Sequence, residues 1–126
     1  MPQRGGAVGL LGMPRRPAVR QVYEMPPVYY DVTDDIGHPV LVISVDLVTR
    51  MAMIVTRTTS PHARGDNAIV HAAQPELGLL DVGWWRMEFP RPVPYTVFDE
   101  PDVKRRGELD EVTWEKMVRQ MKGAGE

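Results

Sequence analysis

The feature that most constrains this chain is a series of short apolar runs with no helical stripe between them. Val, Ile, Tyr, Thr and Trp dominate these runs, because branched and aromatic side chains suit a pleated, half-buried surface. Pro, Gly, Asp and Asn separate nearly all of them, a pattern typical of strands joined by turns. The runs occupy residues 21–25, 28–32, 40–45, 51–59, 68–72 and 79–89.

The connections between these runs indicate which kind of sheet they form. Parallel strands need crossover connections of about a dozen residues or more, usually with a helix. No long helical pattern lies between the runs, so the chain favours an antiparallel meander or a small closed barrel. We therefore expect a mainly β fold in which a single helix follows the strands.

That helix is expected at residues 110–122, where it would pack on the barrel. Asp110 can cap the amides of Val112 and Thr113, while Leu109 and Trp114 occupy the two positions of a hydrophobic staple. Gly123 would end the helix. The apolar residues of one face follow helical spacing: they are Trp114, Met117, Val118 and Met121.

Composition excludes several classes of protein. The 126 residues suit one domain, and the absence of Cys rules out disulfides, thiolate metal sites and a cysteine nucleophile. No apolar run reaches the roughly 18 residues of a membrane-spanning helix, and the first residues lack a signal peptide's apolar stretch. We expect a cytoplasmic protein. Because the net charge is −2, any contact with RNA must be local.

Residues 1–20 differ from the rest of the chain. They are rich in Gly, Pro and Arg and contain no acidic side chain. We interpret this segment as a flexible basic arm, and residues 21–122 as the folded domain. Two interpretations of the arm stay open: a loosely packed tail, or a segment whose charge contacts RNA or a partner.

Three segments together resemble the MazF/PemK toxin family. The sequence G-H-P-V-L-V-I-S at 37–44 and the sequence M-I-V-T-R-T-T-S at 53–60 are similar to the two central strands of that family. The sequence R-R-G-E-L-D at 105–110, followed by an amphipathic helix, is similar to its closing element. The resemblance spans roughly residues 20–122, and it rests on the order and spacing of the three segments.

The resemblance implies a small SH3-like β-barrel of the MazF/PemK/CcdB kind. It further implies a homodimeric toxin of a toxin–antitoxin system. Such a toxin is an endoribonuclease that cleaves single-stranded RNA without a metal or other cofactor and is silenced by an antitoxin protein. The family's catalytic threonine corresponds to Thr59, and its catalytic arginine corresponds to His38.

The histidine at position 38 changes the chemistry that the resemblance implies. Arginine grips a phosphate with two hydrogen bonds and stays charged, whereas histidine is a competent general acid or base. Arg57 lies two residues before Thr59, so on a strand both side chains project from one face. We therefore predict that His38, Thr59 and Arg57 form the catalytic group, with Arg57 restoring the positive charge.

Four further side chains are candidates for RNA binding: they are Ser60, Trp85, Arg86 and Tyr30. Aromatic rings can stack on unpaired bases, but core packing is the favoured role for one member of each adjacent pair. Because neighbours on a strand point to opposite faces, we expect one of Trp84 and Trp85 to be buried and the other to be exposed or at an interface.

Two other functions stay open at this point. The histidines at 38, 62 and 71 match no zinc pattern, and the chain contains neither a serine-hydrolase elbow nor a phosphate-binding loop. One alternative is a catalytically silent SH3-like barrel that binds a protein or a nucleic acid. The other is an accessory structural protein whose basic arm locks assemblies together.

Overall fold

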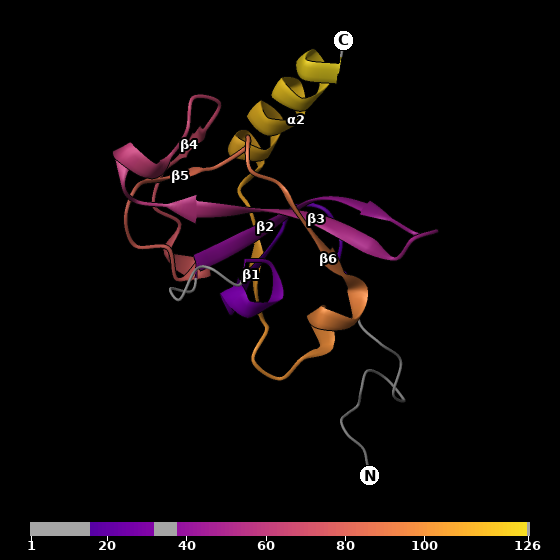
Figure 1. The fold of residues 1–126 in the computed structure, drawn as a ribbon. Helices are drawn as coiled ribbons and strands as arrows, with labels where there is room; N and C mark the ends of the chain where they lie inside the picture. Colours follow the sequence, from indigo (N-terminus) through magenta and orange to yellow (C-terminus); the bar gives the residue numbers. More distant parts are fainter. Residues whose placement is uncertain (1–15, 32–37, 126) are drawn as a thin grey trace.

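The computed structural model describes residues 16–31 and 38–125, and within these ranges the protein is mainly β with a C-terminal helix (Figure 1). This arrangement confirms the expected fold class. The strands are β1 (Gln21–Met25), β2 (His38–Asp46), β3 (Met51–Thr58), β4 (Ile69–His71), β5 (Gly83–Trp85), β6 (Arg91–Pro94) and β7 (Lys104–Glu108). The α-helix is α2 (Glu111–Gly125), and four short 3-10 helices are η1 (Pro27–Tyr29), η2 (Pro61–Ala63), η3 (Pro75–Leu77) and η4 (Tyr95–Asp99).

The strands form one antiparallel sheet in the order β4-β5-β3-β2-β1-β7. β6 pairs with the first half of β3, and β5 pairs with its last two residues, so the two short strands share one edge of β3. Strand pairing does not join β4 to β7. The closed barrel expected from the sequence is therefore corrected to an open sheet. At this gap the Gln74 side chain donates a hydrogen bond of 3.1 Å to the carbonyl of Glu108.

Several predicted strand boundaries are wrong where proline or charge dominates. Residues 28–31 form η1 and its end instead of a strand, because consecutive prolines fix φ and remove donors; Val32 lies outside the described residues. The predicted run 79–89 contains only the three-residue β5. β6 contains two prolines and lies outside the predicted runs, but it pairs along the edge of β3.

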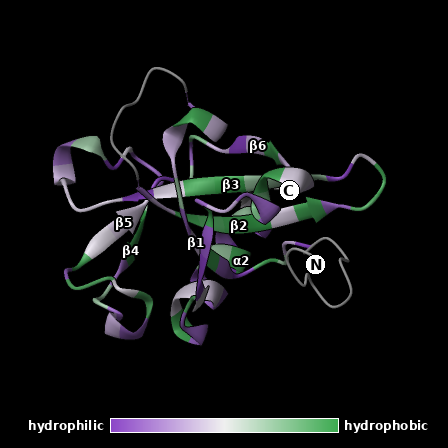
Figure 2. Cartoon of the chain, turned by 90° about the horizontal axis from the view of Figure 1, so that it is seen from below, coloured by the Kyte–Doolittle hydropathy of each residue, from purple (hydrophilic) through white to green (hydrophobic). Residues whose placement is uncertain are grey.

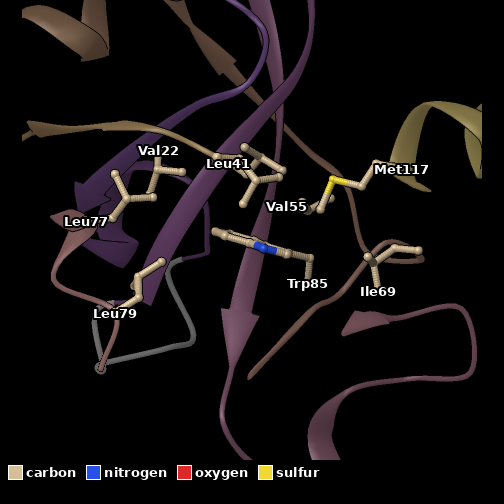
Figure 3. Close-up of a cluster of buried hydrophobic side chains, with 9 residues drawn as sticks. Val22, Leu41, Val55, Ile69, Leu77, Leu79, Trp85 and Met117 are labelled. Carbon is tan, nitrogen blue, oxygen red and sulfur yellow. The ribbon is translucent and has the colours of Figure 1, made fainter. Parts of the chain in front are cut away.

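Both faces of the sheet are buried by separate hydrophobic clusters. Because side chains alternate along a strand, Val22, Leu41 and Val55 enter the first cluster, while Tyr23 and Val40 enter the second. Figure 2 shows that the central strands β2 and β3 are largely hydrophobic. In the first cluster the Trp85 ring lies centrally, with leucines from the η3 region on one side and Met117 of α2 on the other (Figure 3).

Helix α2 begins as expected from its cap. The Asp110 carboxylate accepts hydrogen bonds from the Thr113 amide at 2.9 Å and from the Thr113 hydroxyl at 3.0 Å. Met117 is buried in the first cluster, and Trp114 and Met121 pack against it. The helix continues beyond Gly123, so the expected stop there is wrong. None of the helices in the described ranges has the length and apolar content of a membrane crossing.

The end of the predicted basic arm is anchored to the fold. Residues 1–15 lie outside the described residues, but Pro17 is buried. The side chain of Arg20 donates to the carbonyl of Leu109 at 2.7 Å, and its amide donates to the carbonyl of Val42 at 2.9 Å. The chain therefore joins the sheet and the start of α2 before β1 begins.

We predict that Asp110→Ala lowers the free energy of unfolding by about 1 to 2 kcal/mol, because it removes the N-cap of α2. Urea denaturation monitored by circular dichroism measures this change. Glu115→Ala is the matched control, since Glu115 is exposed on the same helix and should change stability little. Equal losses in the two variants would contradict a specific role for the cap.

Candidate functional site

A cavity of about 620 Å³ lies where β1 ends and β2 and β7 begin. One wall is apolar and includes Pro26, Pro27, Pro39, Leu77 and Leu79. Its lining also includes one histidine and four charged residues: they are His38, Glu24, Asp102, Lys104 and Arg106. The cavity therefore combines a histidine, two carboxylates and two cations beside an apolar surface.

Strand register explains why these charged residues meet. Glu24 of β1 is paired with Lys104 of β7, and on its other edge with Pro39 of β2. A register shift in the β1–β7 ladder lets Arg106 reach across as well, so its guanidinium donates to the carboxylate of Glu24. About half of each of these two side chains is exposed. An ion pair with that exposure stabilises a protein little, so a ligand can displace either partner.

A second carboxylate is held at the rim of the cavity. The Tyr29 hydroxyl donates a hydrogen bond of 2.8 Å to Asp102. This bond is the main cause that raises the pKa of Tyr29 to about 12. The tyrosine is protonated at neutral pH, as tyrosines ordinarily are, and acts as the donor. Asp102 is thereby fixed beside Lys104, at the start of β7.

The structure brings His38 and Thr59 to the same end of two paired strands. The β2–β3 ladder runs to Val40 and Thr56, and His38 and Thr58 each lie two residues further along. His38 lines the cavity, whereas Thr59 follows β3, is exposed and is not part of the lining. The turn after β3 is fixed by Thr58, whose hydroxyl accepts a hydrogen bond from the Ser60 amide at 3.1 Å.

Arg57 occupies a different environment from the one predicted. Its side chain is 4% exposed and donates to Nδ1 of His71 at 3.0 Å, to the carbonyl of His71 at 3.1 Å and to the carbonyl of Asp81 at 2.8 Å. Burial lowers the pKa of Arg57, although arginine remains charged in proteins. A cation enclosed by protein acceptors cannot reach a phosphate, so the structure argues against its predicted role at the scissile bond.

His71 is the buried partner of Arg57 and was not expected to have a role. Because Nδ1 accepts from Arg57, the neutral ring carries its proton on Nε2, which lies 3.0 Å from Oε1 of Gln74 and 3.1 Å from Asp110. Burial is the main cause that lowers the pKa of His71, and the Arg57 charge adds to it. This polar group links β3 and β4 to the start of α2.

The predicted RNA-binding residues are divided between surface and core. Trp85 is completely buried, so it cannot stack on a base, and Tyr30 packs against the second cluster. Arg86 is partly buried, with its guanidinium 4.8 Å from the centre of the Phe89 ring. Ser60 is exposed. The tryptophan that reaches the surface is Trp84, which is partly exposed as expected for one member of the pair.

Glu24, Lys104 and Arg106 were missed as site residues. Lys104 and Arg106 belong to β7, whose sequence K-R-R-G-E has no apolar alternation to mark it as a strand. The R-R-G-E segment was noticed only through the family resemblance. Its partner Glu24 was assigned to a strand, but nothing in the sequence indicated that β1 pairs with β7. Within the described residues, no group of His, Asp and Glu side chains that could hold a metal is found.

We predict that acidification destabilises the protein through His71. Since the folded state keeps this ring neutral, only the unfolded chain gains a proton as the pH falls below about 6.5. The free energy of unfolding should therefore decrease from pH 7 to pH 5, by up to about 1.4 kcal/mol per pH unit for this one group. Urea denaturation at several pH values measures the slope.

The slope should become shallower in His71→Gln and stay unchanged in His62→Gln, because His62 is exposed on the loop after β3. Identical slopes in the wild type and His71→Gln would contradict the assignment.

The sequence matches no protein-family model, and no curated protein matches it either.

Proposed function

We propose that this chain is an endoribonuclease that cleaves single-stranded RNA at the cavity formed by β1, β2 and β7. The observation that carries the proposal is the lining of that cavity, which includes His38 from β2, Glu24 from β1, and Lys104 and Arg106 from β7. These are the groups that RNA cleavage needs: a base, an acid and positive charge.

In the proposed reaction, the ribose 2′-hydroxyl attacks the adjacent phosphorus. Glu24, which shares the face of Val22, accepts the hydroxyl proton as the 2′-oxygen bonds to phosphorus. His38, which shares the face of Val40, donates a proton to the 5′-oxygen from the other side as the phosphorus–oxygen bond breaks. The products are a 2′,3′-cyclic phosphate and a free 5′-hydroxyl. Each proton is transferred to or from a protein side chain, so this scheme needs no metal or other cofactor.

The cations of β7 take the role that the sequence suggested for Arg57. Arg106 is paired with Glu24 before substrate binds, and it can turn to a phosphate oxygen, which arginine binds with two hydrogen bonds. That exchange releases the Glu24 carboxylate to act as base. Lys104 adds a second positive charge. Thr59, exposed at the end of β3, would donate its hydroxyl to the same phosphate.

The same proposal includes the more specific expectations from the family resemblance. We propose that the open sheet is a variant of the SH3-like barrel of the MazF/PemK family. The chain would act as a cytoplasmic homodimer whose activity an antitoxin blocks. What supports this is the position of His38 and Thr59, which lie at one end of neighbouring strands as the resemblance requires.

A silent binding module is the second candidate, and one observation favours it. The Glu24–Arg106 pair neutralises two of the proposed catalytic charges, and prolines and leucines form much of the remaining wall. Such a surface can also bind an extended peptide. The two candidates differ in whether a bond in RNA is broken.

We predict that the purified protein cleaves single-stranded RNA to 2′,3′-cyclic phosphate ends in the presence of a chelator. His38→Ala should reduce kcat by about 10²- to 10⁴-fold, the usual contribution of a general acid. Arg106→Ala should reduce it by about 10²- to 10³-fold, because it removes a donor to the charged transition state. Gel electrophoresis and end-group analysis of a labelled oligonucleotide measure both effects.

Arg105→Ala is the matched control for Arg106→Ala. The two arginines are neighbours on one exposed strand, but only Arg106 lines the cavity. Equal activity in the wild type and His38→Ala would contradict the proposed site. No cleavage by the wild type would favour the binding module instead.

A further inference from the structure

The last residues of β3 and the short strands beside them present two different faces. On the inner face, Arg57 is paired with Trp85, which is paired in turn with Ile69, and all three are buried. On the outer face, Thr58 is paired with Trp84, which is paired with Val70. Here Val70 is 46% exposed, and Thr58 and Trp84 are only partly buried.

Trp84 is not used by the hydrophobic core. Among the described residues it belongs to neither buried cluster and is not packed against either of them. Within residues 16–31 and 38–125, its ring meets Arg64, whose guanidinium carbon lies 5.9 Å from the ring centre. Arg64 is exposed and forms no ion pair within the part of the chain that the structure describes. An aromatic face and a cation therefore meet at the surface.

This surface continues toward His38, which lines the cavity from the face of Val40, whereas Glu24 lines it from the face of Val22. Thr58 lies between Trp84 on β5 and the start of β2. Alternation along β3 puts Thr58 on the face of Thr56, which is paired with Val40 of β2. Alternation along β2 puts His38 on the face of Val40, so His38 and Thr58 share one face. Strands in a sheet are spaced by about 4.8 Å, so Trp84 lies roughly 10 to 15 Å from His38 along the sheet. A single-stranded RNA covers that distance with a few nucleotides.

We infer that Trp84 is a stacking platform for one unpaired base of the RNA and that Arg64 binds the phosphate of the same nucleotide. Every base has a flat π-face, so an exposed tryptophan binds single strands with little regard to sequence. An exposed cation–π contact is weaker than base stacking, so an arriving base can displace Arg64 from the ring. The inference rests on the proposed function, because the RNA is taken to run from Trp84 to the bond cleaved at His38.

The test uses a single-stranded 2′-O-methyl oligonucleotide, which lacks the attacking hydroxyl and reports binding without cleavage. Fluorescence anisotropy should show that Trp84→Ala weakens binding by about 5- to 150-fold, the range expected for one stacked base. Trp84→Phe should retain most of the affinity and guards against a folding defect. Val82→Ala is the control, since Val82 is exposed just before β5.

The role of Arg64 has a separate measurement. Arg64→Ala should reduce the slope of log affinity against log salt concentration by about 0.7, the contribution of one phosphate contact in a single strand. Arg50→Ala should leave the slope unchanged, because Arg50 is exposed at the opposite end of β3.

The outcomes separate the inference from the proposed function. Unchanged affinity in Trp84→Ala overturns the platform, even if the wild type cleaves RNA. Affinity that depends on Trp84, in a protein that does not cleave unmodified RNA, supports the platform and overturns the nuclease. If the wild type does not bind the oligonucleotide, the platform is overturned, and the cleavage assay on unmodified RNA then decides the nuclease separately.

Discussion

The buried guanidinium of Arg57 organises the part of the molecule that lies beyond the centre of the sheet. It extends from β3 and donates to acceptors in β4 and just before β5, two short strands with few ladder bonds of their own. Its guanidinium carbon also lies 6.0 Å from the centre of the Trp85 ring. Since a buried charge without partners is costly, these acceptors and the cation depend on one another.

The close approach of the chain to this cation explains why position 83 is a glycine. A side chain at Gly83 would place its Cβ 2.7 Å from the guanidinium carbon of Arg57 and 2.9 Å from the carbonyl of Thr58. Only glycine therefore lets β5 pair with β3 at this point. That pairing determines which tryptophan of the consecutive pair enters the core, and hence which one reaches the surface.

Much of the fold could be predicted where hydrophobic alternation and capping chemistry are strong. Local apolar patterns predict the strands β1, β2 and β3, and the Asp110 cap predicts the start of α2. β6 and β7 could not be found in this way, because two prolines interrupt one and charges fill the other. Their strand conformation depends on pairing with distant strands. Whether β4 pairs with β7 to close a barrel also depends on contacts between distant segments, which local patterns do not predict.

The candidate site was predictable only in part for the same reason. The common end of β2 and β3 follows from a hairpin, a local feature that places His38 near the end of β3. The contact between Glu24 and Arg106 joins positions 82 residues apart, and no local pattern predicts it. Arg57 was assigned to the site because alternation gives the face of a strand, but alternation does not say which face is buried.

The long separation between β1 and β7 has a consequence for a chain that is still being synthesised. Contacts between distant positions form only after the intervening chain is available, since closing the loop must precede the gain from pairing. A nascent chain on the ribosome that has not emerged as far as β7 has no Lys104 or Arg106 beside Glu24. The charged cavity therefore forms only after β7 has left the ribosome, so the translating ribosome is exposed to a chain that still lacks this cavity.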